Sequence, residues 1–325
     1  EVLSMAEPTA FGFLDDDTGS VSLEQTNLAV NEGNTLSLIS QEIQIRGSAL
    51  TARSGEISIL SSASAGEIEK PTDEKTEEPQ ISRGGPITLS EGSSLDVDGD
   101  PSGNIFIRCG KFMAEDSHIK ARNFSDKNGG ITDIQADEIS FINTPMYFTL
   151  GSEDMEELNI QGDGQRVRFT AWDSLRLTDT YIEASVWGIG KGPDFFLEAP
   201  NVSLTDASIS CIAERAGDAG NITIHADSVS LLSDRNMGSK LLSESSGIGN
   251  AGLISIDAKD VSIKNSSMIS SYSADGIGEG GDVRINASES VRLESGSTIY
   301  AAVGGPASHT ADAGDIEINA KNISL

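Results

Sequence analysis

The chain is poor in aromatic residues and has no long apolar run. Aromatic residues make up 5% of its 325 residues, although hydrophobic residues as a whole make up 37%. Because bulky aromatic side chains fill much of a broad globular core, their scarcity favours a narrow core of aliphatic side chains. No stretch approaches the roughly 20 apolar residues of a membrane helix. The first ten residues also lack the charged start and apolar segment of a signal peptide.

Basic residues are scarce as well. The chain has 22 Lys and Arg against 51 Asp and Glu, a net charge of −29 and a pI near 4.2. Binding to nucleic acid requires a basic face, so no nucleic-acid partner is expected. Docking on anionic lipid is disfavoured for the same reason. The acidic balance is compatible with solubility outside cells, with cation binding or with simple repulsion between chains. We favour repulsion, which requires no specific function.

One sequence pattern recurs through the chain. The segments AGNITIHADSVSLL (from residue 219), AGLISIDAKDVSI (251), GGDVRINASESVRL (280) and AGDIEINAKNISL (313) share the form G-x-h-x-h-x-A, where h is apolar. Polar residues and then h-x-h follow, which indicates two short strands separated by a polar corner. The Ala returns every 27 to 35 residues, and Cys109 takes its place in one copy. The recurring alanines are Ala136, Ala171, Ala199, Ala226, Ala258, Ala287 and Ala320.

A third short segment follows in most copies, at residues 180–182, 208–210, 267–269 and 297–299, and a variable loop rich in Gly, Ser and Asp comes after it. Three short strands in a repeat of about 30 residues predict an all-β solenoid, a parallel β-helix. The Ser, Thr, Val and Ile content excludes helical solenoids of similar period. About ten coils at roughly 4.8 Å each would give a rod on the order of 50 Å long.

The repeat also predicts which side chains stack on one another. Apolar positions should form columns inside the coil, and the position before the Ala should form a polar ladder outside it. The predicted inner columns are Ile222, Ile254, Val283 and Ile316, then Ile224, Ile256, Ile285 and Ile318; the predicted ladder is Asp257, Asn286 and Asn319.

The pattern divides the chain into three parts. Residues 1–65 are less regular N-terminal coils, residues 66–83 are a charged, Pro-containing loop insertion between coils, and residues 84–325 are repetitive coils that are open at the C-terminal end. A second acidic loop begins at residue 151. Because exposed terminal strands invite edge-to-edge pairing, we expect a piece of a longer rod that can associate end to end or side by side.

The repeats GNITIHADSVSL and GGDVRINASESVRLESGSTI, with PTAFGFL near the start, resemble the filamentous haemagglutinin-like exoproteins of two-partner secretion. This resemblance implies a right-handed parallel β-helix from a Gram-negative bacterium, exported through a dedicated outer-membrane pore. It also implies a secreted or cell-surface adhesin that contacts host or neighbouring cells, with glycans among the candidate partners. The secretion domain of the family, with its signal peptide and Asn-Pro-Asn-Gly turn, does not occur in these residues, so export is inferred.

A catalytic role is the alternative, because several β-helices are polysaccharide lyases or hydrolases. Such chemistry needs an acid and a base, or a metal and a base, on one face. The three histidines, His118, His225 and His309, come from distant copies, and the first two should face solvent. We therefore expect no enzyme and no cofactor. A third hypothesis is a purely structural shaft that presents an adhesive or toxic segment located elsewhere in its protein.

Two smaller features have structural explanations. Asp96, Asp98 and Asp100 alternate in the segment DVDGDPSGN, as calcium ligands do, but a bidentate Glu is missing and a plain turn is favoured. Cys109 replaces a small inward Ala, and Cys211 lies two residues after an inward Ile, so both should be buried small hydrophobic residues. Two distant cysteines form neither a disulfide framework nor a CxxC metal motif.

The remaining aromatic residues are the candidate contact site. Trp172 lies at a corner, Trp187 in a variable loop and Phe196 in an outward column, and exposed aromatic rings can bind a sugar or a protein partner. Arg168 and Thr223 should flank Phe196 in the neighbouring coils. In the alternative interpretation, which we favour, the loop covers the tryptophans and Phe196 stacks under Arg168.

Overall fold

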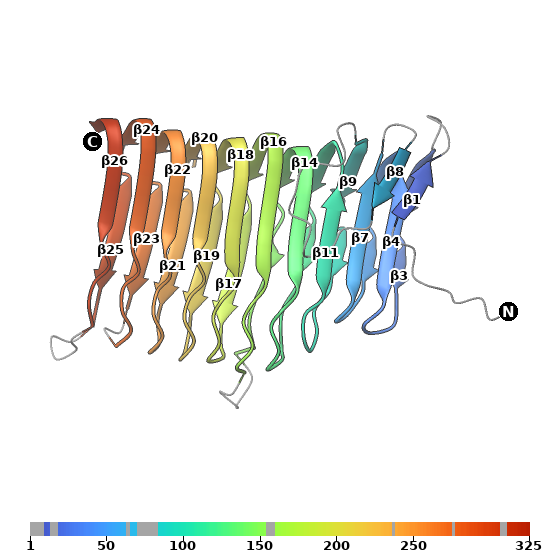
Figure 1. Ribbon diagram of the computed structural model, residues 1–325, viewed down its shortest axis with the longest axis horizontal. Coiled ribbons are helices and arrows are strands. Elements are labelled where there is room, and N and C mark those ends of the chain that lie inside the picture. Colours follow the sequence, from blue (N-terminus) through green and yellow to red (C-terminus); the bar gives the residue numbers. More distant parts are fainter. Residues whose placement is uncertain are drawn as a thin grey trace.

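The structure, a computed structural model, describes residues 10–13, 19–62, 66–69, 84–153, 160–235, 238–274, 277–305 and 311–325. Every helix or strand in this part of the chain is a β-strand. The strands stack coil upon coil into a rod, and the coils follow one another in sequence order along it (Figure 1). The chain is a parallel β-helix, as the repeat predicts.

The N-terminal coils have separate short strands. They comprise β2 (Ser20–Glu24) and β3 (Asn27–Ala29); β4 (Thr35–Ser40), β5 (Glu42–Arg46) and β6 (Ala49–Thr51); β7 (Glu56–Ser61), β9 (Pro86–Ser90) and β10 (Ser94–Asp96); and β11 (Asn104–Arg108), β12 (Lys111–Glu115) and β13 (His118–Lys120).

In the later coils the first two strands join into one long, bent strand. The long strands are β14 (Ile131–Ile142), β16 (Arg166–Thr178), β18 (Asp194–Thr205), β20 (Ile222–Leu232), β22 (Ile254–Lys264), β24 (Val283–Glu294) and β26 (Ile316–Ser324). The third strands are β15 (Met146–Tyr147), β17 (Tyr181–Val186), β19 (Ser208–Ala213), β21 (Lys240–Ser245), β23 (Met268–Ser273) and β25 (Thr298–Val303).

The long strands differ from the predicted separate ones because hydrogen bonding continues through the corner. The amides of Asp137 and Glu138 both donate to the carbonyl oxygen of Gly110, at 2.8 and 3.1 Å. The ladder between β14 and β16, in the following coil, shifts its register at the same corner, between Ala136 and Glu138, as in a β-bulge.

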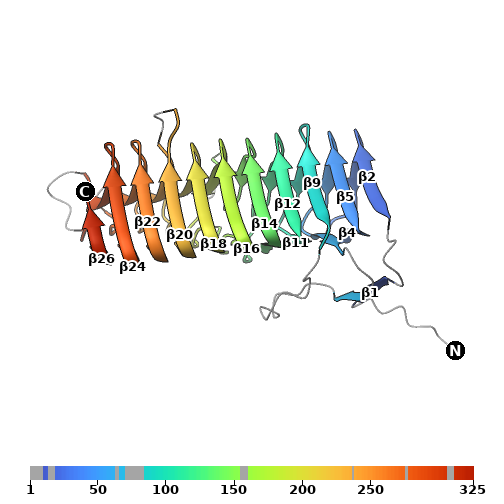
Figure 2. The same ribbon diagram turned by 90° about the horizontal axis from the view of Figure 1, so that it is seen from above.

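Each coil has three faces. Face 1 contains β4, β7, β11 and the first halves of the long strands; face 2 contains β2, β5, β9, β12 and the second halves, and is seen from above in Figure 2. Face 3 contains β3, β6, β10, β13 and the third strands. A 14-stranded sheet forms faces 1 and 2 and a 10-stranded sheet forms face 3, all in parallel pairing.

The core consists of the predicted inner columns. Ile222, Ile254 and Val283 are direct partners in successive coils and are fully buried. The second column, which begins at Ile224, follows the same register. Ile316 on β26 is 46% exposed. In the middle coils aromatic side chains enter the core as well, and the fully buried ones are Phe112, Phe141, Phe148, Phe169 and Phe195.

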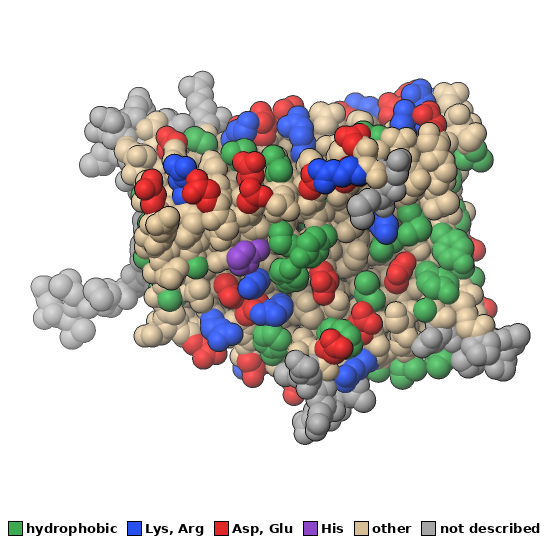
Figure 3. All heavy atoms as spheres, turned by 180° about the vertical axis from the view of Figure 1, so that it is seen from behind, with side chains coloured by type: hydrophobic (Ala, Val, Ile, Leu, Met, Phe, Trp, Pro, Cys, Tyr) green, Lys and Arg blue, Asp and Glu red, His purple; other side chains and the backbone are tan. Residues whose placement is uncertain are grey.

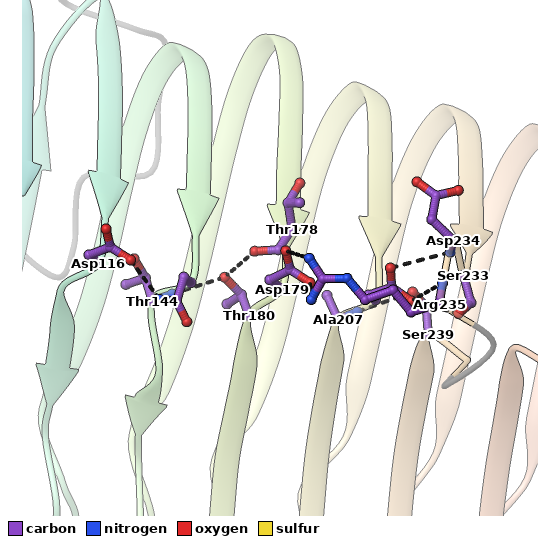
Figure 4. Close-up of polar contacts among 12 residues, drawn as sticks. Asp116, Thr144, Thr178, Asp179, Thr180, Ala207, Ser233, Asp234, Arg235 and Ser239 are labelled. Atoms are coloured by element: carbon purple, nitrogen blue, oxygen red, sulfur yellow. Dashed lines mark hydrogen bonds and ion pairs between the residues drawn. The ribbon is translucent and has the colours of Figure 1, made fainter.

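The corner between faces 2 and 3 combines a left-handed residue with a buried hydroxyl group (Figure 4). Asp179, with φ of 49°, turns the chain, and Asp tolerates this conformation better than most residues. The next residue, Thr180, accepts a hydrogen bond from the amide of Thr144 in the preceding coil and donates to the carbonyl oxygen of Thr178. Ser239 accepts from the amide of Ala207 in the same way. This hydroxyl ladder satisfies buried backbone groups that the turn would leave without partners.

The charged insertion begins with regular structure. Its first residues form β8 (Gly66–Glu69), which pairs antiparallel with β1 (Ala10–Phe13) on the outer side of face 1 (Figure 2). The insertion lies between β7 and β9, which is within one coil and not between coils. Residues 70–83 of the predicted loop and residues 154–159 of the acidic loop lie outside the described residues. Among the residues that are described, no helix is long and apolar enough to cross a membrane.

Candidate partner-contact surface

Phe196 projects outward from face 1 and is packed between two charged or titratable side chains. Its direct partners are Arg168 on β16 and Thr223 on β20, as predicted. The guanidinium carbon of Arg168 lies 5.7 Å from the centre of the Phe196 ring. The ring of His225 meets the Phe196 ring edge to face, with centroids 5.1 Å apart. Phe196 is half-buried in this stack, which confirms its position under Arg168. The predicted cover of the tryptophans by the loop is wrong for Trp172, whose side chain is exposed.

Trp187 lies in the loop after β17, and its side chain is also half-buried. Its backbone amide donates to the carbonyl oxygen of Leu150 at 2.8 Å, and the guanidinium of Arg215 lies 5.7 Å from its ring centre. Arg215 in turn donates to the carbonyl oxygen of Glu153. These contacts hold the indole ring in place and leave part of it accessible.

Trp172 is the most accessible of the three predicted contact residues, with 36% of its surface exposed. It lies at the corner between faces 1 and 2, whereas Trp187 lies near the opposite corner, where the chain leaves face 3. None of the contacts recorded for the described residues joins two of Trp172, Trp187 and Phe196. The three side chains lie in two adjacent coils without forming a single cluster.

The predicted polar ladder continues the same outward surface toward the C-terminal coils. Asn286 donates through Nδ2 to Oδ1 of Asp257 at 2.9 Å, and Asn319 donates to Oδ1 of Asn286 at 3.1 Å. Asp257 also faces His225, with Oδ2 and Nε2 3.5 Å apart. Stacked side-chain amides of this kind link successive coils and present a regular polar surface.

The alternating aspartates do not converge on a common centre. Asp98 is buried, and its carboxylate accepts from the amide of Arg122 at 2.7 Å and from the guanidinium at 2.8 and 2.5 Å. Asp96 accepts from the amide of Asp98, which makes a local turn. No group of three or more His, Cys, Asp and Glu side chains that could hold a metal ion occurs in the described part of the chain. The plain-turn interpretation is the one that the geometry supports.

The histidines lie on different faces. His118 projects from β13 on face 3, and burial and the nearby Lys120 lower its pKa. His225 is exposed on face 1, and His309 lies outside the described residues. Cys109 and Cys211 are buried as predicted, and burial raises the pKa of both thiols, which keeps them in the unreactive protonated form.

Sequence reasoning overlooked the tyrosines. All four tyrosines of the chain lie on face 3, and Figure 3 shows hydrophobic side chains interspersed with charged ones on this side of the rod. Tyr147 and Tyr181 meet edge to face, with ring centres 5.9 Å and hydroxyl oxygens 2.5 Å apart. Tyr272 and Tyr300 have ring centres 5.6 Å apart. The sequence held a signal for Tyr181. It directly precedes the inward Ile182, and successive side chains of a strand point to opposite sides, so Tyr181 could have been predicted to point outward.

The chain matches no protein-family model, no curated protein and no solved structure. The physical features of the outer surface therefore carry the functional argument.

Proposed function

We propose that this chain is a non-catalytic segment of a secreted or cell-surface exoprotein, in which a stiff β-helical rod presents contact surfaces to other cells. The observation that carries the proposal is the contrast between the inside and the outside of the coil. Inner columns such as Ile222, Ile254 and Val283 repeat with little change, whereas their outward neighbours Thr223, Ser255 and Arg284 differ in every coil.

This contrast suits a rod whose core provides length and stiffness while its surface provides contacts. A solenoid gains stability from each coil-to-coil interface, so the outer side chains are free to vary. Exposed aromatic groups such as Trp172 are the side chains most able to bind a sugar ring or an apolar protein surface.

The resemblance to filamentous haemagglutinin-like exoproteins supports the same function and adds a location. The proposed protein is exported from a Gram-negative bacterium through an outer-membrane pore and acts as an adhesin or scaffold at the cell surface. Its partners are host or neighbouring cells, with glycans as candidate ligands, and other copies of the same rod.

A cell-retention assay tests the proposal. The purified chain, fixed to beads, is mixed with bacterial and animal cells, and a β-helix without aromatic residues on its surface serves as the comparison. We expect retention that free chain competes away. Absence of retention on every cell type would contradict the adhesin and leave a structural shaft, while release of shortened sugar products would contradict the non-catalytic assignment.

A further inference from the structure

Face 3 carries two similar clusters of side chains. In the first, Tyr147 is the direct partner of Glu183 on β17, and Tyr181 lies two residues before Glu183. The second cluster has the same diagonal arrangement, because Tyr300 lies two residues before the direct partner of Tyr272. Glu244 on β21 is the direct partner of Tyr272, so each pair of tyrosines has an adjacent carboxylate.

The tyrosine rings are accessible. Tyr181 is 45% and Tyr300 47% exposed, while Tyr147 and Tyr272 are half-buried beneath their partners. Contact with Tyr181 and burial raise the pKa of Tyr147 to about 12, so its hydroxyl group stays protonated at neutral pH. A protonated phenol offers both an apolar ring and a hydrogen-bond donor.

The surface between the two clusters is nearly uncharged. Only Glu183, Lys240 and Glu244 are charged within strands β15, β17, β19, β21, β23 and β25, a net charge of −1, whereas the whole chain carries −29. The outward side chains of β19 are Ser208, Ser210 and Ile212, and Leu242 lies between Lys240 and Glu244 on the outward side of β21. We call the outward surface of these six strands the tyrosine strip.

We propose that the tyrosine strip binds an uncharged polysaccharide that lies along the axis of the rod. This inference rests on the proposed function. It names the ligand class and the location of one of the contact surfaces of the rod. Sugar rings have apolar faces that stack on aromatic rings and hydroxyl groups that need hydrogen-bond partners. The strip supplies both kinds of group twice, with a carboxylate after Tyr147 in the first cluster and before Tyr272 in the second.

Charge selects this ligand over other partners. An anionic polymer would meet a chain of charge −29, and a cationic one would prefer the acidic surfaces elsewhere to a strip that is nearly neutral. The carboxylates of Glu183 and Glu244 accept hydrogen bonds from hydroxyl groups, and Lys240 donates them. Glu244 is half-buried in the strip, and this burial raises the pKa of its carboxyl group.

The area of the tyrosine strip favours a polysaccharide over a second copy of the chain as its ligand. Six coils at about 4.8 Å and strands of six residues give a strip about 24 Å long and about 20 Å wide, or about 480 Å². A stable protein interface buries about 800 Å² on each partner. The strip is therefore too small to hold two rods together, but a narrow linear polymer can occupy its whole length.

Affinity electrophoresis tests the proposal. Native gels contain a soluble α-glucan, β-glucan, mannan or galactan, and a polyuronate gel serves as the anionic comparison. The wild-type chain is compared with Tyr181→Ala/Tyr300→Ala, with Tyr181→Phe/Tyr300→Phe and with Ile248→Ala, which removes an exposed apolar side chain in a loop outside the strip. Thermal unfolding of each variant confirms that it is folded.

We expect retardation of the wild type by at least one neutral polysaccharide, with affinity about 10-fold or more weaker in the double alanine variant. The phenylalanine variant should keep most of the affinity, and Ile248→Ala should keep all of it. Equal retardation of wild type and double alanine variant, retardation by polyuronate alone, or none by any neutral polymer would overturn the proposal.

The same variants separate this inference from the proposed function. If the double alanine variant is retained on cells as well as the wild type, the adhesin proposal stands and the tyrosine strip is not its contact. Loss of self-association in that variant, measured by light scattering, without a change in polysaccharide binding would assign the strip to a second copy and overturn the proposal.

Discussion

The buried ion pair of Asp98 and Arg122 distinguishes a structural turn from a calcium loop. Replacing Asp98 with Ala removes all three hydrogen bonds that its carboxylate accepts from Arg122. The amide of Arg122 then lacks a partner, which costs about 1–3 kcal/mol. The guanidinium is 40% exposed, so water can replace its partner. We expect a loss of about 2–3 kcal/mol in the free energy of unfolding.

Removing the other partner of the ion pair should destabilise the fold more. Arg122→Ala leaves the carboxylate of Asp98, which is 1% exposed, without a counter-ion. Breaking a buried pair in this way costs about 3–5 kcal/mol. Urea unfolding followed by circular dichroism measures both variants, with the exposed Glu115→Ala as the control, and hydrogen exchange of the Arg122 amide reports the local effect.

Calcium completes the test. A site occupied at 100 times its dissociation constant would add about 2.7 kcal/mol to stability. We expect no shift of the urea midpoint in millimolar calcium for the wild type or for either variant. A clear calcium-dependent gain in the wild type that disappears in Asp98→Asn would refute this account of the segment.

Three further predictions concern the core, the corner and pH. Ile224→Ala should cost about 2–5 kcal/mol, because neighbouring coils hold the cavity open, whereas the outward Thr223→Ala should stay within about 0.5 kcal/mol in the same urea assay. Ser239→Ala should cost about 1–3 kcal/mol by leaving the Ala207 amide without a partner, and faster exchange of that amide would be its signature. Burial raises the pKa of Glu244 above 4.5, because the folded state favours the neutral carboxyl group. This preference stabilises the folded state below pH 4.5 and is lost as the pH rises through the pKa of the folded state. Glu244→Gln should therefore be more stable than wild type at pH 7, and an unchanged pH profile of unfolding would contradict this.

The inner columns could be predicted because strand alternation and the repeat length act together. Once Ile222 and Ile254 are aligned, every inward position of the coil follows from a period of two. The same reasoning placed Phe196 beside Arg168. The contact between His225 and Phe196 was not predictable in this way. His225 lies two residues after Thr223, the direct partner of Phe196, so the contact depends on the side-chain rotamer of His225.

Other features depend on information that the repeat does not contain. The pairing of β1 with β8 joins segments more than 50 residues apart, and neither segment follows the repeat. The insertion that contains β8 therefore looked like a loop. The corner before face 3 did leave a signal, because Asp, Asn or Gly precedes Ser or Thr in most coils, as in Asp116, Asn143 and Asp179.

The central claim is that the outer surface of the rod binds without catalysing a reaction. The most direct measurement mixes the purified chain with neutral and acidic polysaccharides and follows retention of the polymer and release of shortened products in the same sample. The account predicts retention of a neutral polysaccharide with no product over time. Release of products that grows with chain concentration would contradict it and would identify an enzyme.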